Sequence, residues 1–349
     1  MAISFSLLIP SYNRPDLILE TIDSLLRQVA DRFEIVVADD ASPRQAEILK
    51  VLAPYSDSGR IKVIAHSKNL GWSENRNTLV RAASNDWVIL LGDDDRLKYG
   101  ALQTIAQWIK KFPNADVLGM GYDVIDEKGC RVYTYCSPKP VLYNIGSPGG
   151  WKELFYFDAV PMWSHHPFTM CTRRQVALKF PYDRSAGIGD DTLCLFEMLN
   201  GGCTFVTINQ ALFEWRNVFR QAGNYTTLSS DVDRCLNSRA LILGTLLTRD
   251  NLTPTVSELV RTDTFLQRFL YLDSGKLGEL RKCLTVAGHD ASRLRERLTE
   301  FVGPIVDTRW NKVRRHVRAA AIMGPRHFLQ LMKYLLDRRK LSQGPSVLV

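Results

Sequence analysis

The sequence predicts an α/β domain, with a mostly parallel sheet flanked by helices, followed by a helical C-terminal region. Three observations support this: apolar runs alternate with amphipathic segments up to about residue 125, their connections are short, and helical spacing dominates from about residue 228 onward. We therefore expect the α/β domain over residues 1–225 and the helical region over residues 226–349.

The predicted strands are five apolar runs, at residues 5–9, 33–38, 61–65, 87–91 and 117–122. Apolar side chains recur at helical spacing over residues 18–26 and 102–109, between these runs. Ser42 and Ser73 are predicted to cap two further helices. Strands that alternate with helices in this way are typical of a parallel sheet wound with right-handed crossovers.

Composition indicates an ordinary globular chain. Its 349 residues are 45% hydrophobic and 23% charged, and no apolar run reaches the ~18–20 residues that span a bilayer. The N-terminus lacks the basic and small-residue pattern of a signal peptide. Seven scattered cysteines without a C-x-x-C pair favour neither a disulfide framework nor a zinc site. We expect a cytoplasmic protein.

The net charge of +8 is concentrated near the C-terminus, because residues 309–340 carry ten Lys or Arg and one acid, Asp337. Such a segment suits an anionic membrane surface, so a peripheral position on the inner face of the membrane is one expectation. A solvated helical face is the alternative. Trp310, Phe328 and Tyr334 interleave with the basic residues, but we expect no nucleic-acid partner.

The predicted carboxyl ends of the strands are polar, which matters because parallel α/β sheets bind ligands at that edge. The motifs G-x-G-x-x-G and G-x-x-x-x-G-K-[ST] are absent, which disfavours an ordinary dinucleotide-binding dehydrogenase or a P-loop enzyme. In "LLGDDDRL", Asp93, Asp94 and Asp95 follow an apolar strand. Clustered carboxylates at this edge favour a divalent cation that also binds a diphosphate, although a helix cap or a solvated turn would use the same residues.

Five segments in order resemble the family 2 glycosyltransferases, whose fold is called GT-A, over about residues 4–220. The segments are "LLIPSYNRPDLILETIDSLLRQ", "FEIVVADDAS", "NLGWSENRN", "DWVILLGDDDRL" and "GIGDDTLCLFEML". The resemblance implies a bound nucleotide sugar, a Mn²⁺ or Mg²⁺ ion held by an acidic motif, and inversion at the anomeric carbon.

The resemblance assigns the nucleotide-sugar contacts to residues near strand ends and in two loops: Pro10, Tyr12, Asn13, Asp39, Asn69, Arg76, Asp93 and Arg216. Asp39 is expected to accept a hydrogen bond from the base, and a uracil N3–H would suit it. Arg76 would contact the base or balance the carboxylates; an ordinary surface ion pair is the alternative.

The acidic motif departs from the family pattern Asp-x-Asp-Asp, since Gly92 takes the first position. Aligned this way, Asp93 faces the ribose and Asp94 coordinates the metal, with Asp95 as a second ligand or a supporting residue. A plain D-x-D pattern would instead make Asp93 and Asp95 the pair.

Asp190 and Asp191 match the acidic pair of the family, in which the second carboxylate is the general base. Asp191 is therefore the predicted catalytic residue, although acids at a helix start also stabilise the helix dipole. The segment after residue 212 offers Arg216 and Arg220 as an arginine clamp for the diphosphate, without the histidine that some members carry.

The resemblance implies transfer of a sugar from a nucleotide diphosphate, with UDP as the expected nucleotide, to a glycan or a lipid-linked glycan, as in bacterial O-antigen or capsule synthesis. The signature and membrane helices of processive synthases are absent, so a single addition is expected. His165, His166 and Trp163 are candidates for the acceptor pocket. Two alternatives remain: a nucleotidyltransferase, which would need a Gly-rich basic loop after the first strand, and a degenerate binding module that recruits partners through its basic tail.

Overall fold

The computed structural model describes two units of the chain. Its described residues are 3–30, 32–136, 169–216, 241–242, 244–249, 251–253, 257, 274–286, 288–294 and 296–297. The first unit holds those up to residue 216 together with 251–253 and 257, and the second holds 241–249 and those from 274 onward. The predicted boundary at residue 225 and the basic segment 309–340 lie outside the described residues.

Nine strands of the first unit form one sheet within the described residues, in the order β3-β2-β1-β4-β8-β6-β9-β5, with β7 paired to β6. Their bounds are β1 (Ser4–Ser11), β2 (Arg32–Asp39), β3 (Lys62–Ala65), β4 (Trp87–Leu90), β5 (Arg96–Leu97), β6 (Val117–Ile125), β7 (Arg131–Tyr135), β8 (Met170–Arg173) and β9 (Phe205–Arg216). All five predicted strands are present, as β1, β2, β3, β4 and β6.

The sheet is parallel where the sequence pattern predicts it and mixed elsewhere. The pairs β1·β2, β1·β4, β2·β3 and β6·β9 are parallel. By contrast, β8 runs antiparallel to both β4 and β6, β5 runs antiparallel to β9, and β7 runs antiparallel to β6. The result is the mostly parallel α/β sheet that the sequence predicts.

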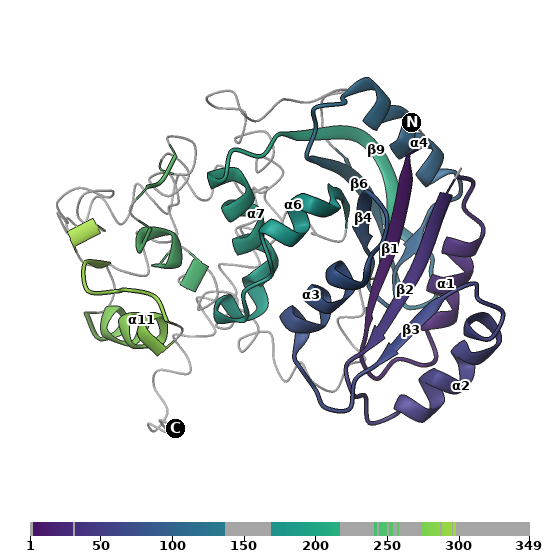
Figure 1. Ribbon diagram of the computed structural model, residues 1–349, viewed down its shortest axis with the longest axis horizontal. Coiled ribbons are helices and arrows are strands. Elements are labelled where there is room, and N and C mark those ends of the chain that lie inside the picture. Colours follow the sequence, from purple (N-terminus) through teal and green to yellow (C-terminus); the bar gives the residue numbers. More distant parts are fainter. Residues whose placement is uncertain are drawn as a thin grey trace. The chain divides into compact units, whose positions relative to one another are not determined.

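Helices cover both faces of the sheet, as Figure 1 shows. On one face lie α1 (Ile18–Leu26), α2 (Gln45–Ser56) and α4 (Ala101–Lys111), and on the other lie α3 (Trp72–Ala82) and α6 (Arg174–Lys179). Alternation along the strands explains this arrangement, because successive side chains point to opposite faces. On β1, Leu7 packs with the α1, α2 and α4 side, whereas its neighbour Leu8 packs with α3 and α6.

Both predicted helix caps are wrong. The helix α2 begins after Arg44, and the side chain of Ser42 bonds to Asp39 instead. The helix α3 begins after Gly71, whose φ of 86° lies in the region that favours glycine, and Ser73 lies inside the helix. In both cases the serine hydroxyl bonds to an aspartate carboxylate of the site, so tertiary contacts take precedence over local capping.

In the second unit, the described residues include α11 (Ser274–Val286). Its buried Leu280 and Leu284 pack closely against the chain at Gly244, where a side-chain carbon would lie 2.8 Å from a methyl group of Leu284. Arg297 donates a hydrogen bond of 2.8 Å to the carbonyl oxygen of Arg249. No helix among the described residues of the chain is long and apolar enough to cross a membrane.

Leu102→Ala should lower the free energy of unfolding by about 2–5 kcal/mol, because Leu102 is fully buried on α4 and its truncation leaves a cavity. Leu49→Ala, on the exposed side of α2 at 36% exposure, is the matched control and should change it by less than about 1 kcal/mol. Urea unfolding followed by tryptophan fluorescence measures both, and equal losses would contradict the assigned core.

Candidate functional site

Parallel pairing gathers three strand ends at one edge of the sheet. Ser11 of β1 lies opposite Asp39 of β2, and Leu8 of β1 lies opposite Leu90 of β4. Backbone bonds continue this order beyond the strands, since Asp40 N donates to Ser11 O and Leu91 N donates to Leu8 O, both at 3.0 Å. The loops that carry the predicted site residues therefore leave the sheet side by side.

Residues 92–95, here called the acidic turn, follow β4. Asp93 is buried, and its carboxylate accepts from the backbone N–H of Tyr12 at 3.0 Å and from Arg14 Nη1 at 2.8 Å. The same Arg14 nitrogen lies 3.2 Å from Asp94 Oδ2. The guanidinium of Arg14 thus bridges two of the three acids and attaches the turn to the end of β1.

Gly92 has a steric role in the acidic turn. A side-chain carbon at this position would lie 2.6 Å from Asp95 Oδ2, which is too close for real atoms, and 3.0 Å from Asp94 Oδ1, which is a tight contact. Two carboxylates therefore fold back over the bare backbone of Gly92 and direct one oxygen each toward the same small space.

Arg216, at the end of β9, supports the acidic turn from inside. Its backbone N–H donates to Asp95 Oδ1 at 2.8 Å, and its Nε donates to the carbonyl oxygen of Asp94 at 2.9 Å. Its other nitrogens bond to the carbonyl oxygen of Glu127 and to the carboxylate of Glu20. Only 1% of the Arg216 side chain is exposed, and its contacts are with protein groups. In this structure it supports the acidic turn and is not positioned as the predicted clamp on a diphosphate.

Burial and the closeness of three acids make it unfavourable for the carboxyl groups of the acidic turn to carry negative charge. Burial raises the pKa of Asp93, an effect that Arg14 opposes. Burial and the neighbouring Asp93 raise the pKa of Asp94 to about 6, and burial and Asp94 raise the pKa of Asp95. Each carboxylate would be easier to ionise with more positive charge nearby.

At the end of β2, Asp39 is buried and forms hydrogen bonds with its own loop. It accepts from the backbone N–H of Ser42 at 3.1 Å, from the Ser42 hydroxyl, and from Gln45 Nε2 at 2.7 Å. The Ser42 hydroxyl also accepts from Asn13 N at 2.8 Å. Asn13 has a φ of 61°, and Tyr12 beside it is 43% exposed, so its ring is available to a ligand.

Asp40 holds the next loop, a role that the sequence did not indicate. Its carboxylate accepts from the backbone N–H groups of Leu70 and Gly71 at 2.7 and 3.0 Å. Its carbonyl oxygen accepts from Asn69 Nδ2 at 3.1 Å. Asn69 is therefore held next to the ends of β1 and β2, at the edge that the sequence pattern predicted for it.

Arg76 lies on α3 and forms a fully buried ion pair with Asp190. One guanidinium nitrogen bonds to both carboxylate oxygens of Asp190, and the Ser73 hydroxyl donates to Asp190 Oδ2 at 2.5 Å. The guanidinium stacks on the rings of Trp72 and Tyr182, with 4.8 and 4.2 Å to the ring centres. Three roles were considered for Arg76: contact with the base, balancing of a carboxylate, and a surface ion pair. In this structure Arg76 balances the carboxylate of Asp190.

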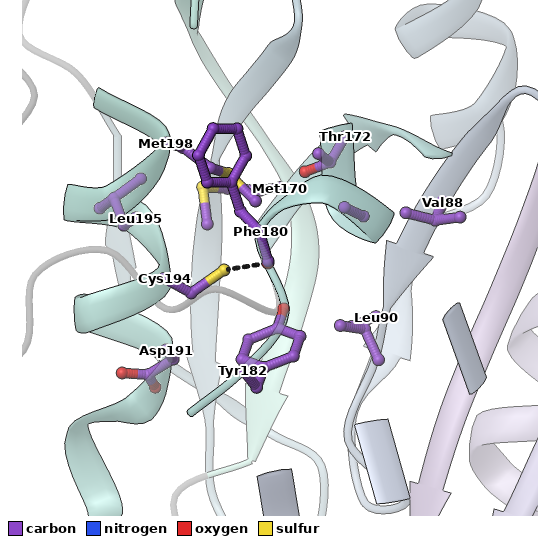
Figure 2. A pocket seen from close by; sticks show the side chains of 11 residues that line it. Val88, Leu90, Met170, Thr172, Phe180, Tyr182, Asp191, Cys194, Leu195 and Met198 are labelled. Carbon is purple, nitrogen blue, oxygen red and sulfur yellow. Dashed lines mark hydrogen bonds between the residues drawn. The ribbon is translucent and has the colours of Figure 1, made fainter. Parts of the chain in front are cut away.

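Asp191 is the second residue of α7 (Asp190–Asn200) and follows Asp190 directly. It is half-buried, its Oδ1 accepts from the Thr192 hydroxyl at 3.0 Å, and it lies at one end of a pocket (Figure 2). Burial raises the pKa of Asp191 to about 6, with Arg76 opposing and Asp190 adding to the shift. The other pocket-lining residues are mainly apolar: Val88, Leu90, Met170, Thr172, Ala177, Phe180, Tyr182, Cys194, Leu195 and Met198.

A divalent cation fits the acidic turn. Asp94 Oδ1 and Asp95 Oδ2 converge over Gly92, and they are hard oxygen ligands of the kind that Mn²⁺ and Mg²⁺ prefer. The protein would supply two side-chain ligands here, because no cluster of three or more His, Cys, Asp or Glu side chains in the described part of the chain is arranged to hold a metal ion. Two carboxylates that leave room for diphosphate oxygens are the usual arrangement for a nucleotide-bound magnesium ion.

Three predicted acceptor residues, Trp163, His165 and His166, lie outside the described residues, as does Arg220. Conversely, Arg14 is a site residue without a predicted role. It follows Tyr12 and Asn13 directly in the chain, but nothing in the sequence shows that it faces carboxylates 79 residues away.

The comparisons with known proteins are consistent with this geometry. Residues 6–178 match the model of the family described as glycosyl transferase family 2. Residues 6–178, here called the family 2 domain, belong to this family. The chain also resembles solved structures of glycosyltransferases with the GT-A fold. At 15–17% sequence identity this likeness concerns the fold alone. The chain spans 37%, 16% and 33% of the lengths of the first curated relatives that it matches.

Three similar proteins illustrate the range of relatives of the family 2 domain. An Escherichia coli UDP-Glc:α-D-GlcNAc-diphosphoundecaprenol β-1,3-glucosyltransferase, WfgD, is 31% identical over 140 residues, covering 40% of this chain and 53% of that protein. Staphylococcus aureus TarS in complex with UDP-GlcNAc has a TM-score of 0.57 at 17% identity, over 86% of this chain and 89% of that one. A Pyrobaculum calidifontis mannosyltransferase with GDP-Man and Mn²⁺ has a TM-score of 0.54 at 15% identity, over 95% and 84%.

Asp191→Asn should stabilise the protein at alkaline pH but much less in acid. Because the folded state raises the pKa of Asp191 to about 6 from 3.8, the protonated carboxyl is favoured in the fold, and this advantage is lost as the pH rises through 6. Asparagine stays neutral and keeps the acceptor oxygen. The gain in unfolding free energy should be about 1–2 kcal/mol larger at pH 8 than at pH 4.5.

Urea unfolding at the two pH values measures this gain. Asp16→Asn is the control, because the hydrogen bond and charge of Arg44 lower the pKa of that exposed carboxyl. It should give no gain at pH 8. An identical effect of Asp191→Asn at both pH values would contradict the raised pKa.

Proposed function

We propose that the protein is an inverting, metal-dependent glycosyltransferase that moves a sugar from a nucleotide diphosphate, with UDP as the favoured nucleotide, to a hydroxyl group. One observation carries the proposal: the family 2 domain buries three adjacent carboxylates at the ligand-binding edge of its sheet, where a cation lowers the cost of burying them. TarS, with bound UDP-GlcNAc, is a structural neighbour that supports a uridine donor.

The nucleotide would bind across the ends of β1 and β2. The exposed ring of Tyr12 offers a surface for the base, with Pro10 and Asn13 beside it and Asn69 on the adjoining loop. Asp39 would accept from the base by exchanging one of the hydrogen bonds that it now accepts from its own loop. Asp93 faces the same edge and is proposed to bind the ribose.

Asp94 and Asp95 would hold the Mn²⁺ or Mg²⁺ ion, with Asp94 the more accessible ligand. The ion would supply positive charge that stabilises the leaving diphosphate. Asp95 is tied to the backbone N–H of Arg216 through its other oxygen, so its position is fixed before any ligand arrives. Arg216 contributes by holding the turn, and Arg76 by holding Asp190.

Asp191 is proposed to act as the general base. It would take the proton of the acceptor hydroxyl while that oxygen attacks the anomeric carbon and the bond to the diphosphate breaks on the opposite face, which inverts the configuration. A pKa near 6 suits this role, because the carboxylate is ionised at neutral pH and still basic enough to accept a proton. The ion pair of its neighbour Asp190 fixes the start of α7.

The proposed acceptor is a glycan or a lipid-linked glycan, in polysaccharide biosynthesis. WfgD, whose name states a diphosphoundecaprenol-linked acceptor, supports this class. We place the protein in the cytoplasm, on the inner face of the membrane, where residues 309–340 would meet anionic lipids. We propose no nucleic-acid partner.

Calorimetric titration with UDP, GDP and TDP, each with and without Mn²⁺, tests the proposal. One diphosphate, expected to be UDP, should bind only when the metal is present, and the matching nucleotide sugars then form a short screen for transfer. If no diphosphate binds under either condition, the proposed function is wrong and a degenerate binding module becomes the better description.

Asp94→Ala and Asp191→Asn should separate the two halves of the site. Asp94→Ala removes a metal ligand and should weaken metal-dependent nucleotide binding at least tenfold. Asp191→Asn should lower the transfer rate by a factor of about 10²–10⁴, the usual range for a lost general base, with nucleotide binding almost unchanged. Equal losses of nucleotide binding in both variants would refute this division.

A further inference from the structure

We propose that Arg14 is a built-in counter-ion of the acidic turn, which weakens divalent-cation binding to the free protein and so couples metal binding to the nucleotide diphosphate. The inference rests on the proposed function for the identity of both ligands, the metal ion and the diphosphate. It gives Arg14 a role that is separate from metal coordination and from proton transfer.

The contact itself is an ion pair between one nitrogen and two acids. Arg14 Nη1 lies 2.8 Å from Asp93 Oδ1 and 3.2 Å from Asp94 Oδ2. Within the described part of the chain, Arg14 is the residue whose cation forms ion pairs with the acidic turn. The other arginine nearby, Arg216, makes its ion pair with Glu20 and otherwise bonds to backbone oxygens. Arg14 therefore supplies the charge that a metal ion would otherwise supply.

Arg14 is also placed so that its side chain can move away from the acidic turn. Its side chain is 38% exposed, against 1% for Arg216. It holds the carboxylates through a single nitrogen rather than the two parallel bonds of a strong guanidinium–carboxylate pair. Its backbone is fixed, since its carbonyl oxygen accepts from Leu17 N and Ile18 N at 3.3 Å. The guanidinium can move while the start of α1 stays in place.

A metal ion and Arg14 would share one carboxylate. Arg14 contacts Asp94 Oδ2, whereas Asp94 Oδ1 points with Asp95 Oδ2 into the space over Gly92. Two positive groups on opposite oxygens of one carboxylate lie a few ångströms apart and repel each other. A nucleotide diphosphate brings negative charge that offsets this repulsion. Metal and diphosphate then strengthen each other's binding by the same factor, as linkage requires.

Mn²⁺ titration of the full chain at pH 7.5, without nucleotide and with saturating UDP, tests the inference. Arg14→Ala should lower the Kd for Mn²⁺ without nucleotide by about tenfold, the effect of removing one nearby charge in a partly exposed site. The factor by which UDP tightens Mn²⁺ binding should shrink correspondingly. Electron paramagnetic resonance of free Mn²⁺ gives both affinities without any measurement of transfer.

Two variants control the experiment. Arg44→Ala removes an arginine of equal exposure, 38%, that pairs with Asp16 on the surface, and it should leave both affinities unchanged. Arg14→Lys keeps the positive charge and should keep the weak Mn²⁺ binding of the parent protein. If Arg14→Ala does not fold, as judged by circular dichroism, Arg14→Gln takes its place.

The inference is overturned if Arg14→Ala leaves Mn²⁺ binding without nucleotide unchanged or weaker, or if Arg14→Lys behaves like Arg14→Ala. A different result is expected if the proposed function itself is wrong. In that case no diphosphate binds the parent protein, while the titration with Mn²⁺ alone still decides the role of Arg14.

Discussion

The parallel pairing of β1 with both β2 and β4 is the constraint on which the site depends. Its register sets Ser11 beside Asp39 and brings the turn after Leu90 to the same edge. Every later contact uses this alignment: Asp93 reaches the backbone of Tyr12, and Asp40 reaches the loop before α3. A shift of one residue would turn each of these side chains to the opposite face of the sheet.

The site contains buried carboxylates at two places, at Asp190 and in the acidic turn, and an arginine pairs with them differently at each. At Asp190 the compensation is permanent, because Arg76 is buried with it between two aromatic rings. At the acidic turn it is partial, because Arg14 is partly exposed and forms ion pairs with Asp93 and Asp94 but not with Asp95 among the described contacts. The buried pair therefore keeps the start of α7 in place, whereas the partly exposed pair leaves the acidic turn open to a further cation.

Much of the fold follows from local pattern, and less of the site does. Five strands are apolar runs, and apolar side chains recur at helical spacing over residues 18–26 and 102–109, so the sequence predicts these elements. The antiparallel strands β5, β7 and β8 are two to five residues long and depend on partners distant in sequence. The acids at strand ends are predictable because parallel sheets bind ligands there. The partners of Arg14, Asp40 and Arg216 are not, because each contact is set by tertiary packing.

The helix α3 joins the two halves of the site as one rigid piece. Its first residues follow the loop held by Asp40, and its Arg76 and Asn77 hold Asp190 and the backbone of Tyr182. A buried charge without its partner costs about 3–5 kcal/mol, so neither member of the Arg76–Asp190 pair can be exchanged alone. Chimaeras assembled from related enzymes must therefore inherit α3 and the start of α7 from the same parent, and recombination points belong outside residues 72–190.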